Sequence, residues 1–204
     1  MKIESVRMAV SRALDPAGTA WFAEARQQVA GDRAALARLF PAVGRKCGRG
    51  QLWTDDPELI GWTVDDAVRT LLLVGASLED VTAVYNYGDA AERRAVLRAL
   101  PLLNLGPGAV PLVLDALRGN DTRLIAAAMG RYAAEHLPID AWRQAVLKCV
   151  LLGIPLAWVA ELEKRKDAEL IRMMRTFAEE RIAAGRPVPP DVQMIVPELR
   201  ADRG

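Results

Sequence analysis

The sequence predicts an all-α protein built from stacked helical hairpins. Apolar residues recur at helical spacing along most of the 204 residues, and no stretch alternates apolar and polar residues long enough to predict a strand. Ala, Leu, Arg and Glu dominate the composition, whereas Thr, Tyr and Phe are scarce, which favours helix throughout. Start and stop signals such as Asp15-Pro16 and Gly185 punctuate the pattern.

Capping residues place the helices of the first half. Proline after Asp15 occupies a first helical position, and we expect this helix to run through Val29. Asp32 caps a helix that ends near Phe40-Pro41, and the glycine-rich basic stretch 43–50 is predicted to be a loop. Three more helices each follow a residue that can cap them: 64–74 after Thr63, 78–85 after Ser77, and 90–100 after Asp89.

Beyond a turn at 105–108 the predicted helices become shorter and closely spaced. We expect them at 109–118, 122–134, 139–152, 155–162 and 167–184, followed by a proline-rich turn and a last short helix. Helices of similar length between 90 and 152, joined by short links, are typical of HEAT-type repeats. We therefore expect one α-solenoid domain over 1–199 and a polar tail at 200–204.

Charge and hydropathy exclude several classes of partner. The 27 basic and 26 acidic residues nearly cancel, so no bulk field attracts nucleic acid or an anionic membrane surface. The longest apolar run, 149–160, is shorter than the about 20 residues of a membrane span, which predicts no membrane insertion. The N-terminus lacks an apolar signal segment, and Cys47 and Cys149 are a distant pair without a disulfide pattern. These features predict a cytoplasmic protein.

Residues that could carry metal or catalytic chemistry are sparse. His136 is the one histidine, and zinc sites or Ser-His-Asp triads need more support than a histidine near a helix end. The acidic pairs at 55–56, 65–66 and 79–80 lie in first helical turns, where acids complement the helix dipole. We therefore predict no metal site and no cofactor, and we assign no catalytic residue.

Two stretches carry candidate binding groups. The loop 44–50 combines glycines with Arg45 and two more cations, which suits either an anion site or a solvated basic loop. In the helix 140–152, Gln144 and Lys148 lie one turn apart among apolar residues. The Lys148 ammonium must reach solvent, meet a ligand, or pair with a carboxylate. The possible carboxylate partners are Glu92, Asp115 and Glu135. Arg131 and Tyr132 could line the same cavity as Lys148.

A set of offsets in the chain resembles one known family. The strongest matches are Tyr132-Ala133-Ala134, Trp142, Gln144, Val146-Leu147-Lys148, Glu180-Arg181, Ala183-Ala184-Gly185-Arg186 and Pro190. Weaker matches are Arg45, Trp62 with Asp66 and Arg69, Gly88-Asp89 with Glu92-Arg93, and Arg118 with Asn120. From about Ala37 to Pro197 the chain resembles the EboA family, described as metabolite traffic proteins from bacterial ebo gene clusters. The resemblance implies an all-helical, HEAT-like protein encoded near enzymes that make or move a prenylated or cyclitol-like metabolite.

The chain departs from the family pattern at several positions. Gly130-Arg131 stands where the family usually has Asn-Pro, and Arg143 stands where it has Asn. Gly-Leu-Asp and Arg-Ala-Asn of the family appear here as Glu161-Leu162-Glu163 and Arg165-Lys166-Asp167. The loss of three asparagines predicts a polar pocket retuned toward a different ligand.

These observations predict a protein that binds or carries a small metabolite in bacterial specialised metabolism. Two alternatives stay open. One is a pathway enzyme of the cyclase or isomerase type, with Lys148 or His136 as acid or base, aided by Tyr132 and Arg69. The other is a helical-repeat scaffold that binds other pathway proteins. The predicted ligand-binding residues are Arg45, Arg69, Glu92, Arg131, Tyr132, His136, Gln144 and Lys148.

Overall fold

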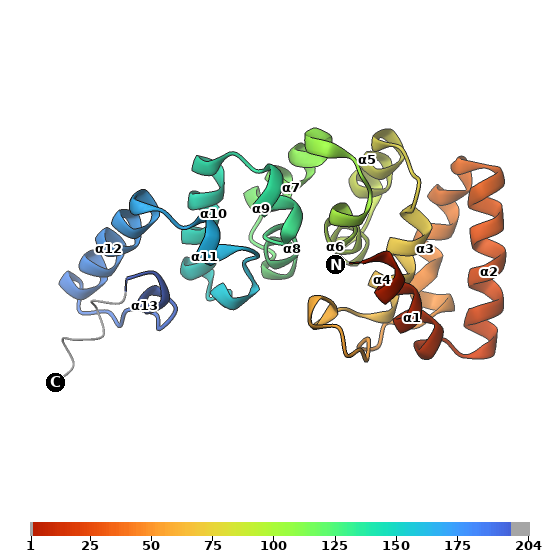
Figure 1. The fold of residues 1–204 in the computed structure, drawn as a ribbon, viewed down its shortest axis with the longest axis horizontal. Coiled ribbons are helices and arrows are strands. Elements are labelled where there is room, and N and C mark those ends of the chain that lie inside the picture. The colour runs from red at the N-terminus through yellow and green to blue at the C-terminus, as the bar shows by residue number, and fades with distance from the viewer. Residues whose placement is uncertain (1, 197–204) are drawn as a thin grey trace. The chain divides into compact units, whose positions relative to one another are not determined.

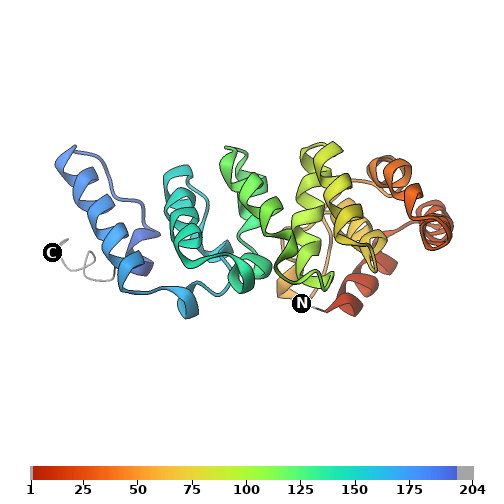
Figure 2. The same cartoon turned by 90° about the horizontal axis from the view of Figure 1, so that it is seen from above.

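The computed structural model of the protein describes residues 2–196. All regular structure in this range is helical, apart from one isolated β-bridge between Gln51 and Thr63 (Figures 1 and 2). This confirms the predicted all-α class. The chain divides into two compact units, 1–114 and 115–204. A single domain over 1–199 and HEAT-like stacking stay predictions, and the predicted tail 200–204 lies outside the described residues.

The first unit is organised around α4 (Val64–Leu73), whose ten residues are all buried. This helix packs against α1 (Ile3–Ala13), α3 (Leu36–Lys46) and α6 (Ala90–Ala99). The remaining helices are α2 (Pro16–Gly31) and α5 (Leu78–Tyr87), with short 3₁₀ turns at Arg33–Ala35, Pro57–Leu59, Leu100–Leu102 and Gly106–Ala109. The apolar residues of α4 therefore form the centre of the core, and its polar residues must find partners inside the protein.

Local capping explains why most of these helices begin where the sequence predicts. The Asp15 carboxylate accepts a hydrogen bond from the Gly18 amide at 2.6 Å, with Pro16 in the first turn. Capping boxes open α4, α5 and α6 at Thr63, Ser77 and Asp89, where each side chain pairs reciprocally with the residue three positions on. The three predicted caps are confirmed.

Two predictions for the first unit are wrong. The helix predicted to end near Phe40-Pro41 continues to Lys46 as α3, so the loop predicted at 43–50 is wrong for 43–46. Helix α1 was not predicted. Val43 is fully buried and extends the apolar face of Leu36, Leu39 and Phe40 by another turn, so packing outweighs the glycines and Pro41. The basic residues of the last turn complement the helix dipole.

The second unit contains shorter helices than predicted. Its elements are the end of α7 (Val110–Arg118), α8 (Thr122–Ala128), α9 (Arg131–His136), α10 (Ile139–Leu152), a 3₁₀ turn at Leu156–Trp158, α11 (Leu162–Arg165), α12 (Ala168–Ala183) and α13 (Val192–Ile195). The single helix predicted over 122–134 is wrong, because extended backbone at Gly130 interrupts it and starts α9. The helix predicted over 155–162 is also wrong, because Glu161 adopts the left-handed conformation (φ 56°) and begins α11 instead.

Arg165 connects three parts of the second unit. Its two terminal nitrogens donate to the carbonyls of Ala133 at 2.7 Å and Leu137 at 2.8 Å, at the end of α9. Its guanidinium carbon lies 4.9 Å from the centre of the Trp142 ring on α10. These contacts satisfy carbonyls that the helix end leaves open, so α9, α10 and α11 hold one another in place.

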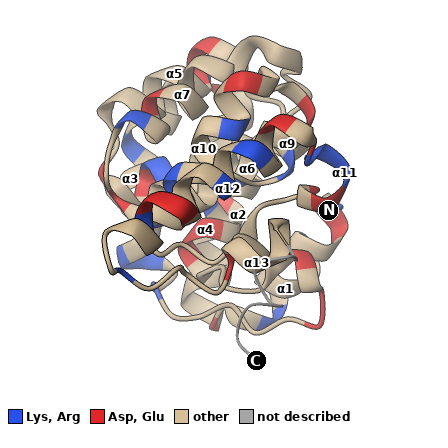
Figure 3. Ribbon diagram, turned by 90° about the vertical axis from the view of Figure 1, so that its left-hand side faces the viewer, with Lys and Arg blue, Asp and Glu red and all other residues tan. Residues whose placement is uncertain are grey.

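Charged residues of both signs are distributed along the helices. Segments of both colours, blue for Lys and Arg and red for Asp and Glu, are scattered over the ribbon in Figure 3, in keeping with the near balance of 27 basic and 26 acidic residues. Sites for charged groups must therefore be sought in local clusters.

Candidate functional site

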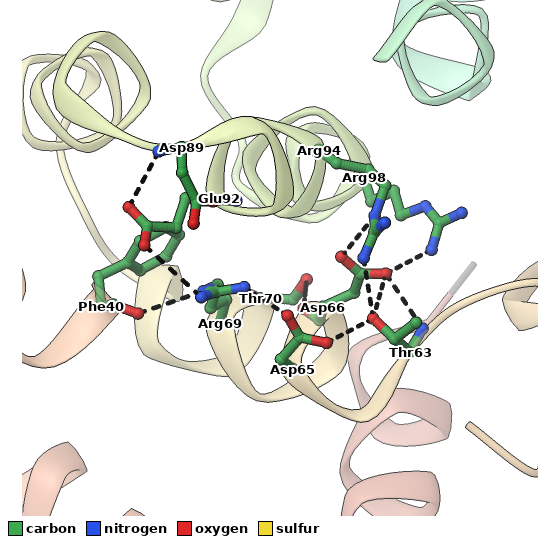
Figure 4. A network of polar contacts seen from close by, with 10 residues as sticks. All are labelled: Phe40, Thr63, Asp65, Asp66, Arg69, Thr70, Asp89, Glu92, Arg94 and Arg98. Carbon is green, nitrogen blue, oxygen red and sulfur yellow. Dashed lines mark hydrogen bonds and ion pairs between the residues drawn. The ribbon is translucent and has the colours of Figure 1, made fainter. Parts of the chain in front are cut away.

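A buried polar cluster lies between α4 and α6 (Figure 4). We call it the α4 polar cluster; its members are Thr63, Asp65, Asp66, Arg69, Glu92, Arg94 and Arg98. The two aspartates and Arg69 are at most 1% exposed. Charges this deep are stable only when they are paired and hydrogen-bonded, so the geometry of each pair matters.

One half of the cluster gathers around Asp66. Arg94 Nε donates to Asp66 Oδ1 at 3.1 Å, and Arg98 donates to Asp66 Oδ2. The Thr63 amide also donates to Asp66 Oδ2 at 3.0 Å, as part of the capping box. Burial lowers the pKa of Arg98 while the Asp66 carboxylate opposes this shift. This half joins α6 to the first turn of α4.

The other half gathers around Arg69. Its Nη1 donates to Asp65 Oδ2 at 2.6 Å, and its Nε donates to the Phe40 carbonyl at 3.2 Å. Its Nη2 lies 3.7 Å from Glu92 Oε1 and has no hydrogen-bond partner among the described residues. A buried donor without a partner is rare in native proteins and calls for an explanation.

Glu92 is less completely buried than its neighbours Asp65 and Arg69. It is 8% exposed, and its Oε2 accepts a hydrogen bond from the Asp89 amide at 3.3 Å. Burial raises the pKa of the Glu92 carboxyl, and the Asp89 charge raises it further, while Arg69 opposes the shift. The carboxyl therefore keeps its proton to a higher pH than an exposed glutamate does.

A cavity of about 320 Å³ opens between α3, α5 and the start of α6. We call it the α3–α5 cavity. Glu92, Arg33 and Asp80 provide its charged groups, and Tyr87, which is 93% exposed, stands beside them. The rest of the lining is apolar or small: Ala34, Leu36, Ala37, Phe40, Pro41, Ala83, Val84 and Gly88. Its size and its few polar groups are typical of a small-molecule site.

Phe40 links this cavity to the polar cluster. Its ring lines the cavity, and the Arg69 guanidinium carbon lies 5.5 Å from the ring centre. Its carbonyl accepts the Arg69 Nε hydrogen bond. Phe40 and Glu92 therefore both line the cavity and both lie beside the Arg69 guanidinium.

Two of the predicted binding residues, Arg69 and Glu92, thus lie together. Arg45 is exposed in the last turn of α3 and does not line the cavity. Asp65 and Asp66 were expected only to complement the helix dipole, which is wrong: they are buried ion-pair partners. The spacing of Asp65 and Arg69, one helical turn apart, was a signal for this.

Three predicted residues lie on α9 in the second unit. Tyr132 is buried, and its ring centre lies 4.6 Å from that of the half-buried His136. Arg131 is exposed and lies 3.9 Å from both Glu135 and Glu161. The structure thus gathers Arg131, Tyr132 and His136 on one short helix.

Lys148 on α10 meets backbone rather than a carboxylate. Its Nζ donates to the carbonyls of Leu117 and Gly119, both at 2.7 Å, just where α7 ends. A lysine in this position satisfies carbonyls that the helix leaves unpaired. Two of its three donors are therefore occupied by a structural contact. Gln144, one turn earlier, is exposed.

The positions that depart from the family pattern pair with one another. Arg131 lies 3.9 Å from Glu161, and Arg143 Nε donates to Asp167 Oδ1 at 3.1 Å. Hydrogen bonding to Arg143 lowers the pKa of the Asp167 carboxyl. The substituted residues therefore compensate one another in charge within the second unit.

Further features bear on cofactors and membranes. Among the described residues, no three His, Cys, Asp or Glu side chains are grouped as a metal ion would require. No helix within 2–196 combines the length and the apolar character that crossing a bilayer demands.

Comparison with known proteins identifies the family. No curated protein and no solved structure matches the chain. A family model described as "Metabolite traffic protein EboA" matches residues 2–197, which is nearly the whole sequence and extends the resemblance to the N-terminus. The chain therefore belongs to the EboA family of metabolite traffic proteins.

Proposed function

We propose that this chain binds a small metabolite in the α3–α5 cavity and carries it within a bacterial specialised-metabolite pathway. One observation carries the proposal: a largely apolar cavity is lined by Glu92, whose carboxyl lies beside a buried Arg69 donor that has no hydrogen bond. The family description as metabolite traffic proteins supports the same function.

The chemistry of the cavity suits recognition of a mostly apolar guest. Phe40, Leu36 and Val84 offer apolar contacts, which favour burial of hydrocarbon by about 25 cal/mol per Å². Glu92 accepts a hydrogen bond from a guest hydroxyl when ionised and donates one to a guest carbonyl when protonated. A site with a few polar groups among apolar walls fixes the orientation of its guest.

The proposal includes the cellular compartment of the protein. Cys47 and Cys149 are free thiols, which suits a reducing compartment, and we place the protein in the cytoplasm. An enzymatic role for Lys148 or His136 and a scaffold role toward pathway proteins stay predictions.

Blocking the cavity tests the proposal. Ala83 is exposed and lines the cavity, so Ala83→Trp fills it without disturbing the core. Ala20→Trp, at an exposed position of α2, is the matched control. Immobilised protein is incubated with a small-molecule extract of the producing cells, and bound compounds are identified by mass spectrometry. We expect at least one compound to be retained by the wild type and by Ala20→Trp but not by Ala83→Trp. Equal retention by all three proteins would contradict the proposal.

A further inference from the structure

A second, smaller cavity of about 110 Å³ lies in the first unit and is lined by three arginines. We call it the arginine cavity. Arg7 comes from α1, Arg26 from α2, and Arg33 from the 3₁₀ turn that follows α2. Apolar residues at the ends of α2 and α4 complete the lining. Three guanidinium groups around one small space repel one another unless negative charge is present.

The described neighbours supply only part of that negative charge. Arg7 lies 3.4 Å from the exposed Glu4 carboxylate, and Arg26 stacks over the Phe22 ring at 5.8 Å. The Arg33 carbonyl accepts a hydrogen bond from the Leu36 amide, but its guanidinium has no ion pair or hydrogen bond among the described residues. Among the ion pairs of the described residues, these three cationic groups therefore meet one carboxylate, that of Glu4.

The C-terminal ends of two helices offset a further part of the positive charge of the arginine cavity. Val29 and Ala30 belong to the last turn of α2, and Leu71 and Leu72 to the last turn of α4. Each helix C-terminus carries about half a negative charge. Three guanidinium groups, one carboxylate and two helix ends leave about one positive charge without compensation. Guanidinium groups bind phosphate and carboxylate oxygens through paired hydrogen bonds, so an oxyanion is the matching ligand.

Arg33 belongs to both cavities. It lines the α3–α5 cavity as well as the arginine cavity. Its guanidinium lies beside Gly75, just after α4. A Cβ added at Gly75 would lie 3.0 Å from Arg33 Nη2. An apolar space and an oxyanion space thus meet at one side chain.

We propose that the guest is an amphiphilic anion, with an apolar body in the α3–α5 cavity and a phosphate or carboxylate group bound by Arg33 and Arg26. This assignment rests on the proposed function and specifies its ligand class. Arg33 is then a specificity residue, because it favours guests that carry an anionic head over neutral guests with the same apolar body.

Calorimetric titration with simple probes tests the assignment. The probes are octyl phosphate, octanoate, octan-1-ol and inorganic phosphate, and the proteins are the wild type, Arg33→Gln, Arg26→Gln and Arg38→Gln. Arg38 is an exposed arginine of α3 that lines neither cavity, which makes it the control. We expect the wild type to bind an octyl anion about tenfold or more tightly than octan-1-ol. Octyl phosphate and octanoate distinguish the two head groups.

The variants separate the contribution of the arginine cavity to binding from that of the α3–α5 cavity. Arg33→Gln is expected to lose about tenfold or more in affinity for the octyl anion and to keep its affinity for octan-1-ol, while Arg38→Gln behaves as the wild type. Arg26→Gln, at an exposed position, gives the same direction of change even if Arg33→Gln folds poorly.

Other outcomes overturn the assignment in distinguishable ways. If octan-1-ol binds as tightly as both anions, or if the Arg33 and Arg26 variants match the wild type, the anion subsite is wrong and the proposed function remains. If inorganic phosphate binds as tightly as octyl phosphate, the two cavities do not share a guest. If neither octan-1-ol nor an octyl anion binds, the proposed function itself fails.

Discussion

Arg69 Nη2 lies 3.7 Å from Glu92 Oε1, at the point where the α4 polar cluster reaches the wall of the α3–α5 cavity. The arginine is fully buried and is held on its other side by Asp65 and the Phe40 carbonyl. The same side chain therefore stabilises the core of the first unit and holds a buried donor without a hydrogen bond beside Glu92, which lines the cavity. Substitution of Arg69 therefore reports on the stability of the wall that carries Glu92.

Removing the Arg69 charge tests the structural part of that role. Arg69→Met leaves the Asp65 carboxylate buried without its ion-pair partner, so we expect the free energy of unfolding to fall by about 3–5 kcal/mol. The double variant Asp65→Leu with Arg69→Met removes both charges and should recover much of this loss. Urea unfolding followed by circular dichroism measures both. A loss below about 1 kcal/mol in the single variant would contradict the buried pair.

The pH dependence of stability tests the environment of Glu92. Its pKa is raised above the ordinary value of 4.5, so the folded state binds this proton more tightly than the unfolded state does. The resulting stabilisation is complete below 4.5 and is lost as the pH rises through the raised folded pKa.

Glu92→Gln removes this proton and its linkage. The wild type should therefore lose stability relative to Glu92→Gln as the pH rises above 4.5. Glu58→Gln, at an exposed glutamate, serves as the control. Unfolding free energies measured across this range check the direction, and a wild type that gains stability relative to Glu92→Gln would show that the assigned shift has the wrong sign.

Lys148 offers a test of the second unit. Its ammonium binds two carbonyls at the end of α7, and hydrogen bonds to charged groups contribute about 1.5–3 kcal/mol. Lys148→Met should lower the free energy of unfolding by about that amount, and Lys148→Arg should retain much of it. Lys164→Met changes a side chain that is 79% exposed and should cost less than about 0.5 kcal/mol. Equal losses in the two methionine variants would rule out the capping role.

Glu161 tests the cost of a left-handed backbone. Its φ of 56° is unfavourable for a residue with a Cβ by about 1 kcal/mol, which glycine avoids. Glu161→Gln and Glu161→Gly both remove the charge that interacts with Lys164 and Arg131. The glycine variant should therefore unfold at a higher urea concentration than the glutamine variant. The reverse order would mean that the left-handed conformation carries no strain.

Local signals explain what the sequence predicted well. The caps at Thr63, Ser77 and Asp89 depend on contacts within four residues, so the pattern of the sequence contains them in full. Residue spacing does not reveal the left-handed backbone at Glu161 or the extended backbone at Gly130.

Long-range contacts explain which features of the structure the sequence did not predict. Asp66 meets Arg94 and Arg98, which lie 28 and 32 residues away, and only the packing of α6 on α4 brings them together. The cavity wall escaped prediction for a similar reason. Leu36 and Val84 belong to apolar helix faces that look the same in sequence whether they border core or cavity.

The most direct test of a guest in the α3–α5 cavity is an NMR titration of the isotope-labelled protein with octan-1-ol. We predict saturable shifts of the amide signals of Ala37, Ala83 and Gly88, which line the cavity, and unchanged signals along α12. Shifts confined to other helices, or none at all up to the solubility of the alcohol, would contradict the account.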